Sequence, residues 1–231
     1  MKYNNKFKSL ALISVAAGLF FANPLQAATA ISGTFFDKNN TSADMTVRAY
    51  SWYNLSMGYL GWTHHSNWGF VKLKKGKPIT IELTTEVSGL HPSITVWYRA
   101  GAKNPKTLPY MNGHAYKQFG DIYEPNAEAT DAENNPVKVG NIIMKFITNG
   151  FDRDGMGDAL PAEYDQSQLY RVMDGVPGKL AITFTPPENG WYQFVVGAIN
   201  PDIDSTAYGS GPGSGAGPAT AHTVHIEVSI P

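Results

Sequence analysis

Short runs of β-branched and aromatic residues recur along most of this chain, and Gly, Pro and Asn separate them. Runs of this length and composition predict β-strands rather than helices. Only one helix is expected, near Pro161–Met173. The strands are predicted at residues 31–36, 45–52, 70–73, 79–83, 94–98, 142–147, 179–184, 191–196 and 223–230.

The last predicted strand has the clearest alternation of apolar and polar positions. Apolar side chains occupy positions 224, 226, 228 and 230, and polar side chains occupy the positions between them. Such alternation is typical of an antiparallel strand with one face on a core and the other in water. The runs at 180–184 and 191–196, joined through Pro and Asn-Gly, predict a β-hairpin. We therefore predict a mainly β fold, an antiparallel β-sandwich-like single domain with long loops and little helix.

Residues 1–27 have the layout of a secretory signal peptide. Lysines precede an apolar run from Leu10 to Ala22, and a proline and several small residues follow it. The run is too short for a comfortable membrane span, and no later segment replaces it. We therefore expect an exported protein whose mature domain covers residues 28–231, with no integral membrane segment in the mature chain.

Composition and charge narrow the possible partners. The chain has no cysteine, so neither disulfides nor thiolate ligands are available, and stability must come from packing, hydrogen bonds or a bound ion. The formal net charge is -1, so no overall field attracts nucleic acid or an anionic membrane. Nucleic acid is therefore excluded as a partner.

The stretch from Trp62 to His65 offers imidazole nitrogens in a chain without thiolates, which suits copper. If the stretch is extended, Trp62 and His64 point to one face and His65 to the other. His64 is then the histidine that shares a site with the indole. A second imidazole must come from elsewhere in the chain, and His114 is favoured because it lies in a similarly aromatic loop. The full set of alternatives is His65, His91, His114, His222 and His225.

The export signal, the Trp62-Thr-His64 triplet, the absent cysteines and the remote His114 resemble a known family. This is the family of copper-repressible, surface-associated copper(I)-binding proteins of methane-oxidising bacteria, to which MopE belongs. The resemblance implies that two histidines bind Cu(I) and that a tryptophan two residues before the first is oxidised to kynurenine. Carried over, Trp62 is the kynurenine, and His64 and His114 are the imidazole ligands. It also implies copper acquisition at the outer cell surface or outside the cell.

A second metal site is expected in the acidic stretch 152–163. Carboxylates stand at positions 1, 3, 7 and 12 and a glycine at 6, which is close to the twelve-residue calcium loop. Position 5 is a methionine, which offers only its backbone carbonyl. We expect a structural calcium ion that stabilises the extracellular domain. The expected ligands are Asp152, Asp154, Met156, Asp158 and Glu163.

Enzymatic functions lack a motif in this sequence. There is no Gly-x-Ser-x-Gly elbow, His-Glu-x-x-His helix or glycine-rich phosphate loop, so we expect a binding protein rather than an enzyme. The alternative is a secreted, calcium-stabilised carbohydrate-binding β-sandwich module with aromatic residues that stack on sugars. Against it, we expect most tryptophans to be core or sheet-face residues. These are Trp52, Trp68, Trp97 and Trp191.

Overall fold

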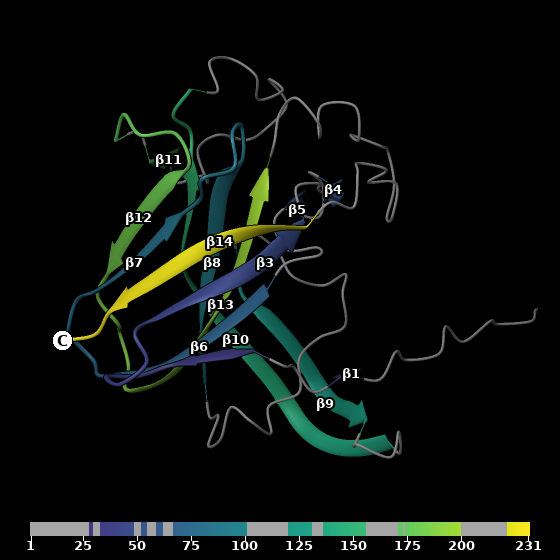
Figure 1. The fold of residues 1–231 in the computed structure, drawn as a ribbon. Helices are drawn as coiled ribbons and strands as arrows, with labels where there is room; N and C mark the ends of the chain where they lie inside the picture. The colour runs from purple at the N-terminus through teal and green to yellow at the C-terminus, as the bar shows by residue number, and fades with distance from the viewer. Residues whose placement is uncertain are drawn as a thin grey trace, which may run out of the picture.

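Two β-sheets packed face to face form the body of the protein (Figure 1). The structure is a computed structural model. It describes residues 28–29, 33–48, 52–54, 59–61, 67–100, 120–130, 136–155, 171–172, 174–199 and 221–231. Within these ranges there is no helix, and so none long and apolar enough to cross a membrane.

The larger sheet has eight strands in the order β1-β9-β10-β8-β13-β6-β2, with β11 beside β10. Its strands are β1 (Ala28–Thr29), β2 (Thr34–Phe36), β6 (Asn67–Leu73), β8 (His91–Arg99), β9 (Ile122–Thr130), β10 (Pro136–Asp152), β11 (Arg171–Val172) and β13 (Gly190–Ile199). The smaller sheet has the order β12-β7-β14-β3. Its strands are β3 (Ser42–Arg48), β7 (Ile79–Thr84), β12 (Lys179–Phe184) and β14 (Ala221–Ser229). A separate pair is formed by β4 (Trp52–Asn54) and β5 (Tyr59–Gly61).

The main core lies between the two sheets. Alternate residues of β14 point into it, and Val224, Ile226 and Val228 are fully buried while their neighbours along the strand are exposed. Facing them are Val196 and Phe194 of β13. Burial of this apolar surface is the main stabilising term of the fold. The mainly β sandwich and the alternation of the last strand are therefore confirmed.

The eight-stranded sheet is also covered on its outer face. In β6, Val71 and Leu73 belong to the main core, whereas Trp68 and Phe70 point the other way into a second apolar cluster. Since successive side chains of a strand point to opposite faces, this sheet buries both its faces. We call this second set the outer cluster. Its buried members are Trp68, Phe70, Trp97, Ile122, Ile142, Met144 and Val195.

The predicted strands are all present where the structure describes them, but most extend beyond the predicted ends. Residues 179–184 match β12 without change, whereas the strand predicted at 142–147 is only part of β10. The helix predicted near 161–173 is wrong at its end, because Arg171 and Val172 pair with β10 as a strand. Residues 161–170 and 173 of that segment lie outside the described residues.

The predicted hairpin of β12 and β13 is wrong. β12 pairs with β7 in the smaller sheet, and β13 pairs with β6 and β8 in the larger one. Both strands bury apolar side chains in the main core. This burial is gained when the two strands lie in facing sheets, rather than side by side in one sheet. At the crossing, the Tyr192 hydroxyl donates a 2.8 Å hydrogen bond to the carbonyl of Glu188, as at a tyrosine corner.

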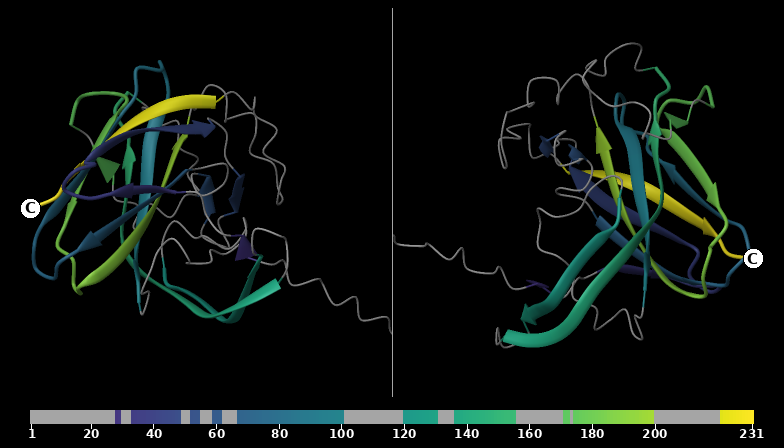
Figure 2. Two further views of the ribbon diagram at one scale, coloured as in Figure 1. Left: turned by 60° about the horizontal axis from the view of Figure 1, so that its bottom comes forward. Right: turned by 180° about the vertical axis from the view of Figure 1, so that it is seen from behind.

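Strands β9 and β10 continue beyond the sandwich as a curved arm (Figure 2). β10 first pairs with β9 and then, past Met144, runs through the sheet beside β8. The register shifts at three places along β10, and such bulges bend a strand. The last residues of β10 thereby come to lie beside the start of β8, where an acidic cluster is found.

Candidate functional site

The residues expected to hold copper fall outside the described part of the chain. Trp62, His64, His65 and His114 all lie there, so their positions stay predictions. The structure does describe the elements that flank them in the sequence. β5 ends immediately before Trp62, and β6 begins at Asn67, three residues after His64. On the other side, the chain is described again from Gly120, six residues after His114.

The described residues on these two flanks, Trp68 and Gly120, both contact the side chain of Trp97. The rings of Trp68 and Trp97 pack with their centroids 6.4 Å apart on the outer face of the larger sheet. The indole Nε1 of Trp97 donates a 3.2 Å hydrogen bond to the carbonyl of Gly120. These two contacts of Trp97 link the start of β6 to Gly120, from which the chain leads back to His114.

Trp68 and Trp97, which we call the anchors, lie in an apolar environment. Trp97 is fully buried and Trp68 is 9% exposed, and both belong to the outer cluster with Ile142 and Met144. The expectation that these tryptophans pack in the sheet is therefore confirmed, and Trp191 is half-buried beside the same cluster. The side chain of Trp52 is outside the described residues. An apolar wall of this kind excludes water from whatever packs against it, which raises the strength of polar and metal contacts nearby.

The other histidines of the candidate set lie elsewhere. His225 is on the solvent face of the smaller sheet, across the main core from Trp68, and its Nδ1 is 2.7 Å from Asp44 Oδ1. His222 and His225 line a cavity of about 730 Å³ on that side. Among the described residues, the buried Nε2 atom of His222 has no hydrogen-bond partner. This arrangement places His225 away from Trp68, and the choice of His114 as the second imidazole stays a prediction.

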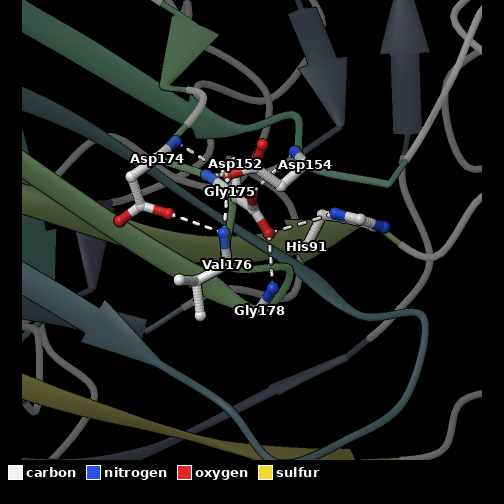
Figure 3. Close-up of polar contacts among 7 residues, drawn as sticks. All are labelled: His91, Asp152, Asp154, Asp174, Gly175, Val176 and Gly178. Carbon is white, nitrogen blue, oxygen red and sulfur yellow. Dashed lines mark hydrogen bonds and ion pairs between the residues drawn. The ribbon is translucent and has the colours of Figure 1, made fainter.

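The first carboxylate of the acidic stretch is completely buried at the end of β10 (Figure 3). Asp152 Oδ2 accepts a 2.7 Å hydrogen bond from the N–H of Gly178 and lies 3.1 Å from His91 Nδ1. Its Oδ1 accepts a 2.9 Å bond from the N–H of Asp154. Both oxygens are therefore used within the protein, which offsets the cost of burying this group.

The second carboxylate holds a neighbouring turn. Asp154 Oδ2 accepts hydrogen bonds from the backbone N–H groups of Asp174, Gly175 and Val176, at 2.8, 2.8 and 3.2 Å (Figure 3). Successive N–H groups that converge on one oxygen form a small anion-binding nest. Asp154 thus supplies the anion, and the segment at 174–178 is fastened to the end of β10.

The pairing of His91 with Asp152 was not foreseen, since 61 residues separate them in the sequence. The 3.1 Å separation of His91 Nδ1 from Asp152 Oδ2 is that of a hydrogen bond between the ring and the carboxyl group. His91 is 5% exposed and lines a cavity of about 390 Å³ together with Asp154. The predicted strand at 94–98 begins after His91, and nothing beside His91 in the sequence indicates that a buried acid would hold its ring.

The calcium site stays a prediction. Met156, Asp158 and Glu163 lie outside the described residues, and the observed hydrogen bonds account for the burial of Asp152 and Asp154 without an ion. Within the described ranges, no three His, Asp or Glu side chains come together in a way that would hold a metal. A calcium ion would have to share the oxygens of Asp152 and Asp154 with their N–H donors.

Comparison with known proteins identifies relatives. Residues 26–206 match the family model described as copper(I)-binding protein CorA-like. The solved structure of CorA, described as a surface-associated copper-binding protein important in copper acquisition by Methylomicrobium album BG8, is 98% identical. It covers 88% of this chain and 100% of that chain, with a TM-score of 0.78.

A more distant solved structure shares the fold. The secreted protein MopE of Methylococcus capsulatus, in which an oxidised tryptophan is described as facilitating copper binding, is 18% identical. It covers 89% of this chain and 92% of that chain, with a TM-score of 0.57. A comparison with curated protein sequences finds no match.

Proposed function

Since the chain belongs to the family of CorA-like copper(I)-binding proteins, we propose that it is an exported, surface-associated protein that binds one Cu(I) ion for copper acquisition. The proposed ligands are His64, His114 and the ring amine of a kynurenine formed from Trp62. The observation that carries the proposal is the contact of Trp68 with Trp97, because it links the two flanks of the site. The role is one of binding, and we assign no reaction to it.

The length of chain between anchors and ligands is compatible with this site. An extended chain spans at most ~3.3–3.6 Å per residue, so His64 lies within about 10 Å of Asn67. By the same measure His114 lies within about 20 Å of Gly120. Trp97 holds Gly120 by its indole, and Trp68 is next to Asn67 in β6. The two imidazoles can therefore meet over the outer cluster without any change in the sheet.

The chemistry of the proposed ligands suits a monovalent copper ion. Cu(I) has a filled d shell, so two opposed imidazoles and one weak third donor are enough to hold it. Neutral nitrogen donors are favoured where water is excluded, as beside the outer cluster. An imidazole must be unprotonated to bind, so acid should release the ion.

Mass spectrometry of the protein purified from its natural exported source tests the modified tryptophan. Conversion of Trp62 to kynurenine adds one oxygen and removes one carbon, and the peptide containing residue 62 should carry that change. The neighbouring Trp68 serves as the internal control, since it is packed against Trp97 and should be unmodified. An unmodified Trp62 in a copper-loaded sample would remove the kynurenine from the proposal.

We also propose a structural calcium ion at residues 152–163. Its support is the sequence pattern, together with the placement of Asp152 and Asp154 at one turn after β10. Calcium that binds only the folded state stabilises it in proportion to the logarithm of its concentration. A melting temperature that does not change when a chelator replaces calcium would contradict this ion.

The carbohydrate-binding alternative receives less support. Trp68 and Trp97 are buried in the outer cluster, so neither offers a face to a sugar. Trp191 is half-buried, and Lys72 lies over its ring at 5.9 Å from the centroid. Copper therefore remains the proposed ligand.

A further inference from the structure

One end of the sandwich carries a concentration of lysines that the net charge of the whole chain conceals. The turn between β6 and β7, the turn between β2 and β3 and the last residues of the chain lie together there (Figure 1). These turns, the neighbouring turn at 185–189 and the end of β6 carry only two side-chain carboxylates, Asp37 and Glu188. They carry five lysines: Lys38, Lys72, Lys74, Lys75 and Lys77.

Most of these ammonium groups are not neutralised by a described residue. Lys75 is 3.8 Å from Glu188, but Lys38, Lys74 and Lys77 form no ion pair within the described part of the chain. Lys72 extends over the ring of Trp191. Elsewhere, Lys145 lies 3.9 Å from Asp121 and Lys179 lies 3.1 Å from Glu82. The unpaired charge is thus localised at one end, where the lysines repel one another unless an anion binds.

Four of the five lysines surround one cavity. Lys38, Lys72, Lys74 and Lys77 line a space of about 90 Å³ together with Leu73, Ile230 and Pro231, the last of which brings a backbone carboxylate to its wall. A water molecule occupies roughly 30 Å³ of liquid, so the space suits a group as small as a phosphate. Pockets for whole small-molecule ligands are larger, at roughly 300–1,000 Å³. The cavity therefore fits one charged headgroup at a surface rather than an enclosed metabolite.

The lysine turn is held in place by the loop at 185–189. The N–H of Lys75 donates a 2.8 Å bond to Asn189 Oδ1, and the N–H of Gly76 donates a 2.9 Å bond to the carbonyl of Pro186. Gly76 has a φ of 73°, a conformation that L side chains rarely adopt. Because the backbone is already fixed, an anion that binds here does not have to order the turn.

We propose that this end of the sandwich binds the phosphate-bearing lipid headgroups of the cell surface and so attaches the protein to it. Lysine clusters attract anionic lipid surfaces through their summed charge, and the interaction needs no apolar insertion. The inference rests on the proposed surface location but not on copper binding. We call Lys38, Lys72, Lys74 and Lys77 the lysine end.

Attachment through the lysine end gives the protein a defined orientation. β4 and β5 lie at the opposite end of the molecule, as Figures 1 and 2 both show. β6 runs from Asn67 at that side to Leu73 beside the lysine turn. The elements that flank Trp62 to His65 in the sequence therefore face the medium, where copper arrives, while the lysine end faces the membrane.

Vesicle sedimentation with the full-length mature protein tests the attachment. Phosphatidylcholine vesicles with added phosphatidylglycerol should bind the protein, and pure phosphatidylcholine vesicles should not. The double variant Lys74→Gln, Lys77→Gln should bind the anionic vesicles about 25-fold more weakly, at about fivefold for each lysine. The matched control is Lys145→Gln, Lys179→Gln, which removes the same charge from lysines paired with Asp121 and Glu82.

The outcomes separate the possible explanations. Loss of binding in the lysine-end variant alone, with its copper content unchanged, supports the attachment. Equal loss in both double variants, or no binding by the unaltered protein, overturns it. Inorganic phosphate that binds in place of vesicles, with no vesicle binding, also overturns it, since the ligand is then a free anion. Copper content measured on every sample shows separately whether the proposed copper function holds.

Discussion

The segment at 174–178 is held to the sandwich mainly by one carboxylate oxygen, Oδ2 of Asp154. Removal of this oxygen should lower the stability of the folded protein by a measurable amount. Asp154 Oδ2 accepts three backbone N–H bonds and Asp154 is 7% exposed. Asp154→Ala removes the acceptor without adding bulk. Asp154→Asn keeps one oxygen that can accept the N–H bonds, but it removes the charge and replaces the other oxygen with an amide NH2 group. The pair of variants therefore separates hydrogen bonding from charge.

The size of the effect follows from the bonds that are lost. A hydrogen bond to a charged group contributes ~1.5–3 kcal/mol to stability. The three N–H groups belong to exposed residues, so water replaces part of the loss after truncation. We therefore expect Asp154→Ala to lower the free energy of unfolding by about 2–4 kcal/mol, and Asp154→Asn by about half as much. For a domain of this size the melting temperature should fall by roughly 4–16 °C in Asp154→Ala.

Thermal and urea unfolding measure both variants against Asp174→Ala as the control. Asp174 lies in the same turn, is exposed and accepts a single bond from Val176, so its loss should stay below about 1 kcal/mol. The N–H bonds need no ion, so the loss in Asp154→Ala should persist in chelator. An Asp154→Ala variant as stable as the control, or a loss seen only with calcium present, would refute this role of the carboxylate.

Three further predictions concern single residues. Burial raises the pKa of the Tyr192 hydroxyl above its ordinary value of 10.0, so the folded state favours the neutral form. The contribution of this group to folding stability is complete below that pH and is lost as the pH rises. Tyr192→Phe should therefore flatten the decline in melting temperature at alkaline pH. A Cβ at Gly69 would overlap the ring of Phe194, so Gly69→Ala should cost about 1–3 kcal/mol in urea unfolding, and unchanged stability would contradict the packing. Trp97→Phe keeps a buried aromatic ring but loses the hydrogen bond to the Gly120 carbonyl, so copper affinity measured by competition should fall. A loss of folded signal in circular dichroism would instead show that the substitution unfolds the protein.

The sequence predicted strands best where one face is wet. In β14 each exposed position separates two buried ones, so the period of two is visible in the sequence and the prediction is confirmed. β8 is buried almost throughout, and its polar members Ser93 and Thr95 are as buried as Ile94. Such a strand shows no alternation of apolar and polar residues. The predicted strand, 94–98, was therefore shorter at both ends than β8.

Contacts between distant segments could not be read from the sequence. β12 and β13 have the composition and connecting turn of a hairpin, but the choice between pairing and facing depends on the whole sandwich. The link of Asp152 to His91 likewise depends on the long β10 strand reaching the start of β8. The copper ligands were chosen by local pattern and family resemblance, and the structure adds the anchors that connect their flanks.

The most direct test of the account is copper binding by the natural exported protein and by His64→Ala and His114→Ala variants. His225→Ala is the control, because its imidazole lies on the far sheet beside Asp44. We predict one Cu(I) per chain in the unaltered protein and the control, and loss of copper in each ligand variant with the melting curve of the apo fold unchanged. Stoichiometric copper in both ligand variants, or its loss only in His225→Ala, would contradict a site built from residues 64 and 114.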